Sequence, residues 1–264
     1  IEGLPDKETI EQRLRTGKGL TRPELCVLLS YAKISLTKDL LASDIPDHPE
    51  MDYWIMDYFP EILGKKYKKE ILRHRLKREI IATMMANSLI NRMGPTFLKS
   101  RMNKTGASVE QIAQAYLIVR DAFGLRDLWD QIESLNGKVT AKVQLKAMRE
   151  IANLSEHGIT WFLTRLGRDM DVNLDAKEFS AGIKELSKSL DTLVTDDFKS
   201  VLEERKQVSL KDGLPEDLAK QIALMPVLSS ACDIIRIAGE QKTDLRNTAR
   251  TYFCLLYTSD AADD

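Results

Sequence analysis

The chain has 264 residues, which is enough for one large or two ordinary domains that each bury an apolar core. Its 39 Lys and Arg residues balance 40 Asp and Glu residues, and the net charge of −1 excludes a global field that would draw the chain to nucleic acid or anionic lipid. Only 13 glycines and 8 prolines interrupt it, a composition that favours long helices.

The first strong helix signal begins at Thr21. Thr21 can cap a helix, Glu24 completes a capping box three residues later, and Pro23 is tolerated in the first turn. The segment that follows, LCVLLSYAKI, is apolar on nearly all sides. A helix of that kind is enclosed by its neighbours, so we predict that it is the central helix of a first bundle.

The rest of the chain also has helical periodicity. One long helix is predicted over residues 60–92, before the stop signal Met93-Gly94-Pro95. Ser108 and Gln111 form a second capping box, and a helix that begins at Asp175 is predicted to continue at least to Val201. The other predicted helices cover residues 52–59, 125–135, 139–166, 216–224, 227–238 and 243–253.

These elements predict an all-α fold. No stretch alternates in polarity for long enough to form a sheet, and no repeat with a period of about 20–50 residues indicates a solenoid. We predict a multi-helix bundle of two packed helical subdomains, residues 1–137 and residues 138–253, without a sheet.

Both ends of the chain are unusual. The chain begins at Ile1 with neither a methionine nor a secretory signal, so we expect it to be a fragment of a longer polypeptide. The last stretch, CLLYTSDAADD over residues 254–264, resembles the translated read-through of a sequencing adapter. We expect this tail to be disordered and exclude it from the fold; the alternative is a short natural tail.

The spacing of the cysteines and the length of the apolar runs indicate the cellular compartment. Cys26, Cys232 and Cys254 are far apart and have no metal-ligand spacing, so we predict neither a disulfide framework nor structural zinc. No apolar run approaches the roughly 18–20 residues of a membrane span. We expect a reducing, cytoplasmic compartment and no membrane partner.

Several short motifs resemble known catalytic or ligand-binding signatures, but each lacks other residues that its signature requires. G-K-G over residues 17–19 lacks the third glycine and the strand of a dinucleotide site and is typical of a helix end. S-L-T-K over residues 35–38 and K-T-G over residues 104–106 match two signatures of penicillin-recognising serine enzymes, but the S-D-N signature is missing. The acidic turn over residues 44–52 lacks the spacing of a calcium loop, so we interpret its carboxylates as helix-stabilising charges.

A basic run, KKYKKEILRHRLKR over residues 65–78, holds eight Lys or Arg residues. Such a run could contact phosphates, but Tyr67 is its one aromatic residue, which is too few for stacking on single-stranded nucleic acid. An acidic segment precedes it and could fold back onto it. We favour a solvated, self-neutralised face, and the alternative is a docking surface for another domain.

Two amides raise a question about the helix that follows. Asn87 and Asn91 share a face with Ile80 and Met84, beside an apolar stripe. A buried amide without a partner costs about 1–3 kcal/mol, so each amide needs one. The partner is either the backbone end of a neighbouring helix or a domain outside this chain, and periodicity does not choose between them.

Five segments resemble the large bacterial NAD-specific glutamate dehydrogenases. They cover residues 17–34, 73–97, 105–135, 213–238 and 248–253, in the same order as in that family. The resemblance implies the helical C-terminal region, just past a catalytic core with a Rossmann-type nucleotide domain. The implied parent reaction converts L-glutamate to 2-oxoglutarate and ammonia, with NAD as the hydride acceptor. Cys26 and Ser88 depart from the pattern of the family.

No segment matches the family's catalytic or nucleotide-binding motifs, so we assign no catalytic, cofactor-binding or metal-binding residue and expect the chain alone to be inactive. We expect a scaffold role, with the catalytic core of the same polypeptide as partner, in a homo-oligomer without nucleic acid. The alternative is a free-standing α-helical interaction module with a basic docking helix. From charge and amide placement, the expected interdomain contacts are Arg73, Arg75, Asn87, Asn91 and Arg92.

Overall fold

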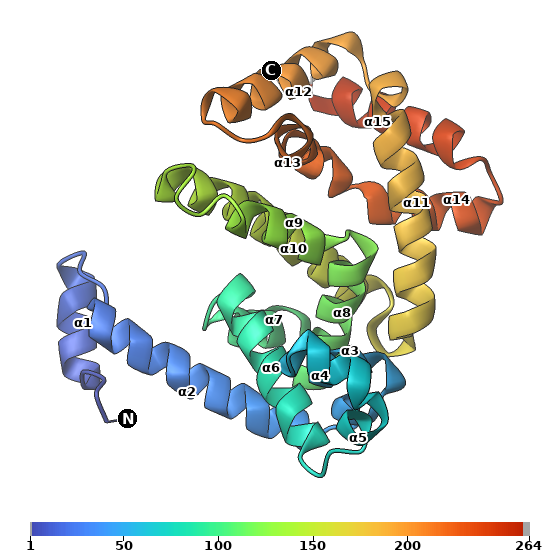
Figure 1. Cartoon of the computed structure of the whole chain (residues 1–264). Helices are drawn as coiled ribbons and strands as arrows, with labels where there is room; N and C mark the ends of the chain where they lie inside the picture. Colours follow the sequence, from blue (N-terminus) through green and yellow to red (C-terminus); the bar gives the residue numbers. More distant parts are fainter. Residues whose placement is uncertain (1, 261–264) are drawn as a thin grey trace. The chain divides into compact units, whose positions relative to one another are not determined.

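The computed structural model describes residues 2–260 of the chain, and all regular structure among them is helical (Figure 1). Fifteen α-helices and three short 3₁₀ helices follow one another, with no strand in the described range. The predicted all-α fold class is confirmed. The helices divide into two compact units, Ile1–Ala113 and Gln114–Asp264. The predicted boundary after residue 137 falls inside the second unit and stays a prediction.

The first unit is built around α6 (Lys77–Met93), which packs against α2 and α3. Ile81, Met85 and Leu89 on α6 are completely buried. The other helices of this unit are α1 (Lys7–Arg15), α2 (Arg22–Leu41), η1 (Ile45–Asp47), η2 (Pro49–Met51), α3 (Asp52–Tyr58), α4 (Glu61–Lys66), α5 (Lys68–Leu72), α7 (Phe97–Thr105) and the start of α8 (Val109–Ala122).

Both predicted capping boxes are confirmed. At the start of α2, the backbone N–H of Thr21 donates to Glu24 Oε2 at 2.7 Å. At the start of α8, the backbone N–H of Ser108 donates to Gln111 Oε1 at 2.9 Å, and that of Gln111 donates to Ser108 Oγ at 3.2 Å. The sequence therefore located two helix starts through their own hydrogen-bond chemistry.

The predicted position of α2 at the centre of a bundle is wrong. Only Leu36 and Leu40, near its C-terminus, are buried, whereas Leu25 and Ile34 are 42% and 52% exposed. An apolar helix needs neighbours on several sides to be enclosed, and α2 has one main helical neighbour, α6. We call residues 7–35, which comprise α1 and most of α2, the α1–α2 arm (Figure 1).

The helix predicted over residues 60–92 is interrupted twice, giving α4, α5 and α6. The backbone leaves helical geometry at Tyr67, where φ is −123° and ψ is 32°, and again between α5 and α6. A continuous helix would place like charges of the run over residues 65–78 one turn apart, which is destabilising. The breaks let α4 and α5 fold against α3 and bury Ile71.

The second unit packs its helices in two groups. α10 lies against α9 and α13, with α12 also on α13, while α11 packs against α14 and α15. Its helices are α9 (Leu125–Glu133), α10 (Ala141–Arg165), η3 (Gly167–Asp169), α11 (Val172–Leu193), α12 (Asp196–Lys211), α13 (Glu216–Leu228), α14 (Ala231–Gln241) and α15 (Leu245–Asp260).

Two boundaries in this unit differ from the prediction. The helix expected to extend from Asp175 beyond Val201 is divided, because Val194 is extended, with φ at −101° and ψ at 156°, and α12 starts after Thr195. At the other end, α15 continues to Asp260, so the described part of the tail over residues 254–264 is helical where disorder was expected. Residues 261–264 lie outside the described residues.

Close contacts hold α10, α11 and α14 together. The rings of Trp161, Phe162 and Phe179 meet edge to face, with centroids 4.9–5.4 Å apart. Trp161 Nε1 donates to Asp233 Oδ1 of α14 at 2.8 Å. At Gly182 of α11, a Cβ atom would lie 2.7 Å from Cδ1 of Ile235, closer than carbon atoms approach. These contacts require the small and aromatic residues that the sequence supplies.

Candidate functional site

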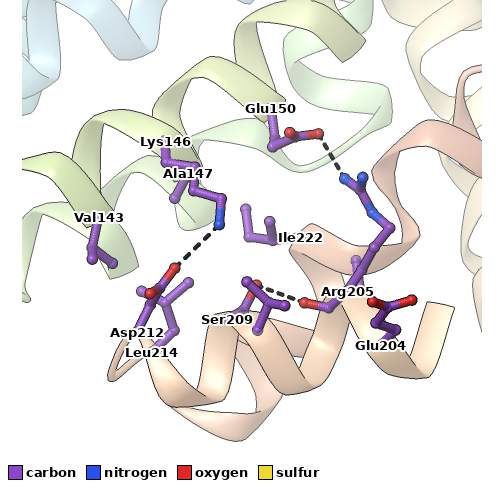
Figure 2. Close-up of a pocket in the computed structure, with 12 residues that line it drawn as sticks. Val143, Lys146, Ala147, Glu150, Glu204, Arg205, Ser209, Asp212, Leu214 and Ile222 are labelled. Atoms are coloured by element: carbon purple, nitrogen blue, oxygen red, sulfur yellow. Dashed lines mark hydrogen bonds and ion pairs between the residues drawn. The ribbon is translucent and has the colours of Figure 1, made fainter. Parts of the chain in front are cut away.

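A pocket of about 200 Å³ opens between α10, α12 and α13 (Figure 2). Two ion pairs start from α10: Lys146 Nζ lies 3.1 Å from Oδ2 of Asp212, the residue after α12, and Glu150 Oε2 lies 3.0 Å from Nη2 of Arg205 within α12. Apolar residues line the space between them, Val143, Ala147, Val208, Leu214, Ile222 and Ala223.

Several polar groups of this pocket already have partners within the chain. Both cations already have a carboxylate partner, and the hydroxyl of Ser209 donates to the carbonyl oxygen of Arg205 at 3.1 Å. The hydroxyl of Ser209 is therefore engaged by the backbone of its own helix. The two pairs are partly exposed, and each therefore stabilises the packing of α12 on α10 by at most about 1 kcal/mol.

Other reactive groups do not converge in the described residues. No group of three or more His, Cys, Asp or Glu side chains is placed to hold a metal ion within that range. Cys26 and Cys254 are exposed, and neither forms a disulfide bond with a described residue. Burial raises the pKa of the Cys232 thiol to about 12, which keeps it protonated and unreactive.

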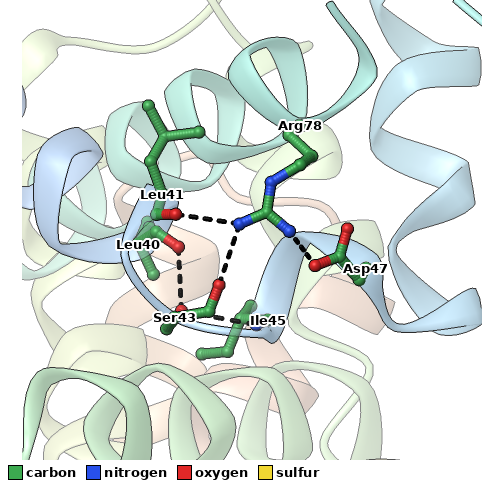
Figure 3. Close-up of polar contacts among 6 residues, drawn as sticks. All are labelled: Leu40, Leu41, Ser43, Ile45, Asp47 and Arg78. Carbon is green, nitrogen blue, oxygen red and sulfur yellow. Dashed lines mark hydrogen bonds and ion pairs between the residues drawn. The ribbon is translucent and has the colours of Figure 1, made fainter.

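The basic run over residues 65–78 ends in a structural contact (Figure 3). Arg78 Nη2 donates to the carbonyl oxygens of Leu41 and Ser43 at 2.8 and 3.1 Å, and Nη1 pairs with Asp47. The last carbonyl groups of a helix lack intrahelical partners, and Leu41 is the last residue of α2. Arg78 therefore caps the C-terminus of α2.

Part of the run is neutralised by the preceding acidic segment, as the favoured interpretation predicted. Besides the Arg78 pair, Lys77 pairs with Asp52, and Lys65 Nζ lies 2.5 Å from Glu61 Oε1. Asp47 and Asp52, interpreted from the sequence as helix-stabilising charges, thus form ion pairs and no side-chain capping bond. Three of the eight cations are accounted for in this way.

The other five cations lie on an exposed surface that also carries apolar side chains. They make no ion pair with any described carboxylate, although Lys66 Nζ lies 5.1 Å from the ring centroid of Tyr67. Ile62, on the neighbouring helix α4, is 76% exposed. We define the α4–α5 surface as Lys66, Lys68, Lys69, Arg73 and Arg75 together with Tyr58, Ile62, Leu63, Tyr67 and Leu76.

The five residues expected to make interdomain contacts differ in exposure and lie on different elements. Arg73 and Arg75 are exposed on the α4–α5 surface, and Arg92 is half-buried near the end of α6. Asn87 is half-buried and Asn91 is exposed, and neither forms a hydrogen bond with any described residue. The first alternative for the amides, a bond to the backbone end of a neighbouring helix, is therefore not observed.

The second unit contains a buried cation that was not predicted from the sequence. Arg120 is only 2% exposed, and its Nε and Nη2 donate to the carboxylate of Asp121 at 2.8 and 2.7 Å. The sequence contained a signal for this burial, because Arg120 directly follows an apolar stretch of α8 that is itself buried, Tyr116, Leu117, Ile118 and Val119. No comparable signal marked Arg78, whose partners are backbone carbonyl groups more than 30 positions away.

No single described helix has the length and apolar character needed to cross a bilayer. Only α13 and α14 taken together meet that criterion of length and composition, as a pair bent by 58°.

Comparison with known proteins identifies relatives along nearly the whole chain. The family described as "Glutamate dehydrogenase, C-terminal" matches residues 17–258. The chain is 36% identical over 254 residues to the NAD-specific glutamate dehydrogenase of Halomonas elongata, and 36% over 255 residues to that of Pseudomonas aeruginosa. It is 28% identical over 256 residues to the protein of the same name in Mycobacterium tuberculosis.

These alignments cover 96–97% of this chain but only 16% of each relative. The family match also continues to residue 258, past the point where the adapter-like tail was expected to start, and the foreign origin of that tail stays a prediction. Because the family match includes most of the chain, the chain belongs to the glutamate dehydrogenase family, in the part of it that is described as C-terminal.

Proposed function

We propose that the chain is the helical C-terminal region of an NAD-dependent glutamate dehydrogenase and braces the catalytic part of the same polypeptide. The parent enzyme oxidises L-glutamate to 2-oxoglutarate and ammonia and reduces NAD. The names of three relatives, each much longer than this chain, support the parent activity. The ion pairs that link α10 to Arg205 and Asp212 in the pocket of Figure 2 support a bracing role for the region itself.

The observation that carries the bracing role is the α4–α5 surface. Protein interfaces are enriched in aromatic residues and arginine, and large exposed apolar side chains that cluster mark contact surfaces. This surface exposes Tyr58, Ile62 and Tyr67 beside the unpaired guanidinium groups of Arg73 and Arg75. Docking against an acidic, partly apolar surface of the catalytic part would cover the apolar groups and pair the cations.

The amides of α6 add a second set of contacts. Asn87 and Asn91 present unpaired donors and acceptors on a face that is only half covered by this chain. In the proposed assembly these amides bond to the catalytic part, as the second alternative from the sequence requires. We further propose a cytoplasmic homo-oligomer, in which the exposed side chains of the α1–α2 arm contribute contacts between copies.

The test uses the complete dehydrogenase polypeptide that contains this region. Arg73→Glu with Arg75→Glu is expected to lower the rate of glutamate-dependent NADH formation at least tenfold, because two reversed charges each cost about 1 kcal/mol or more at a desolvated contact. The matched control is Lys138→Glu with Lys142→Glu, two exposed cations of the second unit, which should leave the rate within twofold. Equal rates in the two variants would refute the α4–α5 docking contact.

The amides are tested separately in the same enzyme. Asn87→Leu with Asn91→Leu should reduce activity if these side chains bond to the catalytic part. Unchanged activity together with equal or higher thermal stability would exclude that role. The alternative function is an interaction module that works independently of the catalytic part. If that alternative holds, removing the whole region from the enzyme should leave glutamate oxidation intact.

A further inference from the structure

A second cavity, of about 600 Å³, lies in the second unit and shares no lining residue with the pocket of Figure 2. It is bounded by the end of α8, the first turn of α9, and the facing sides of α11 and α13, with Leu154 from α10. Small-molecule sites generally measure about 300–1,000 Å³, so the cavity has room for a ligand of ordinary size.

Its charged groups are unequal in number. Arg120, Arg126, Lys184 and Lys188 line it, against the carboxylates of Asp121 and Asp127, so four positive charges face two negative ones. Asp121 is already engaged by the buried guanidinium of Arg120. Among the cations of the cavity, Lys184 and Lys188 have no carboxylate partner among the described residues.

These two lysines are accessible to a ligand. They lie one turn apart on α11, so both ammonium groups reach the same side of the helix. Both side chains are exposed, and neither pairs with a carboxylate among the described residues. Two neighbouring ammonium groups without counter-ions attract an anionic group, most strongly at low salt.

The wall formed by α13 is of a different kind. Its lining residues, Gln221, Leu224, Met225 and Leu228, carry no charge, and Leu224 and Met225 are 7% and 3% exposed. Ile183 of α11 and Leu154 of α10 extend this apolar surface. A ligand in this cavity would meet lysines on one helix and aliphatic groups on the facing one.

We propose that this cavity binds an amphipathic organic anion, a molecule with one carboxylate, sulfonate or phosphate group on an apolar body. The anionic group lies at Lys184 and Lys188, and the apolar body lies against α13. Ser180 and Gln221 line the same space and offer a hydroxyl and an amide to orient polar substituents. The site is independent of the α4–α5 surface, because all of its residues belong to the second unit.

A pair of dyes that differ in one charged group tests the proposal on the 264-residue chain. The probe is 8-anilinonaphthalene-1-sulfonate, and N-phenyl-1-naphthylamine has the same aromatic body without the sulfonate. Lys184→Glu with Lys188→Glu should raise the dissociation constant of the sulfonate at least tenfold and that of the neutral dye less than twofold. The control, Lys142→Glu with Lys177→Glu, has the same net charge change on exposed residues outside the cavity and should change neither constant more than twofold.

A cavity-filling variant keeps the test independent of charge. Ser180→Trp places an indole in the cavity and should weaken both dyes, while circular dichroism confirms that every variant remains folded. If the Lys184/Lys188 variant binds the sulfonate as the control does, or if Ser180→Trp leaves its binding unchanged, the dye binds elsewhere, for example on the α1–α2 arm. Either result overturns the proposed site.

Discussion

α2 and α11 are similar in length, with 20 and 22 residues, yet they differ in how much of their apolar surface is covered. α11 buries five apolar residues at spacings of three and four, Phe179, Ile183, Leu186, Leu190 and Leu193. α2 is apolar on nearly every side and buries only Leu36 and Leu40. Burial therefore follows the one-sided spacing of apolar residues and the number of neighbouring helices, and total apolar content does not determine it.

The difference has an energetic consequence. A side chain gains the full free energy of burial only if packing removes it from water, at about 25 cal/mol per Å². The apolar side chains of the α1–α2 arm remain largely in contact with water in this chain, so they contribute little to its stability. Equal substitutions on α11 and on α2 should therefore have unequal effects.

The largest effect is expected for Phe179→Ala on α11. Phe179 is 5% exposed and packs edge to face on Trp161 and Phe162, so its loss creates a cavity and should lower the free energy of unfolding by about 3–5 kcal/mol. Leu25→Ala is a comparable large-to-alanine truncation on α2, and because Leu25 is 42% exposed it should cost less than about 1 kcal/mol. Urea denaturation measures both. Similar losses would mean that the α1–α2 arm is packed in solution.

A smaller effect is expected at the closest contact between α11 and α14. Gly182→Ala would place Cβ 2.7 Å from Cδ1 of Ile235, and relieving that overlap should cost about 1–3 kcal/mol. Gly239→Ala on α14 is the control, because a Cβ there meets no atom within 4 Å. Since alanine favours the helix over glycine, the control should stabilise by about 0.5–1 kcal/mol. Stabilisation by both variants would show that α11 and α14 are less tightly packed than the structure indicates.

The sequence predicted where helices begin better than it predicted which helices pack against one another. Caps such as Thr21 and Ser108 were predictable, because their hydrogen bonds join residues three positions apart. The exposure of Leu25 and the capping of α2 by Arg78 were not, because both depend on which helices meet after folding. The same limit applies to the cavity in the second unit, which α8, α9, α10, α11 and α13 form together.

The smallest effect is expected at the ion pair that connects α1 to α2 within the sparsely buried α1–α2 arm. Arg13 Nη1 of α1 lies 2.7 Å from Glu24 Oε2 of α2, and the backbone N–H of Thr21 donates to the same oxygen at 2.7 Å. The hydrogen bond from Arg13, followed by those from Thr21, lowers the pKa of the Glu24 carboxyl from 4.5 to about 2. A polar contact thus joins α1 to α2 where apolar packing is sparse.

Because the folded-state pKa of Glu24 is depressed, its stabilising contribution is fully present above pH 4.5 and is lost as the pH falls towards 2. A carboxyl-detected NMR titration should find the Glu24 pKa near 2 in the unchanged chain and closer to 4.5 in Arg13→Ala. Arg15→Ala removes an exposed cation of α1 that has no carboxylate partner among the described residues, and it should leave that pKa unchanged. A Glu24 pKa near 4.5 in the unchanged chain would mean that Arg13 does not hold α1 against α2. In that case α2 would differ from α11 both in how much of it is buried and in how well its neighbouring helix is ordered.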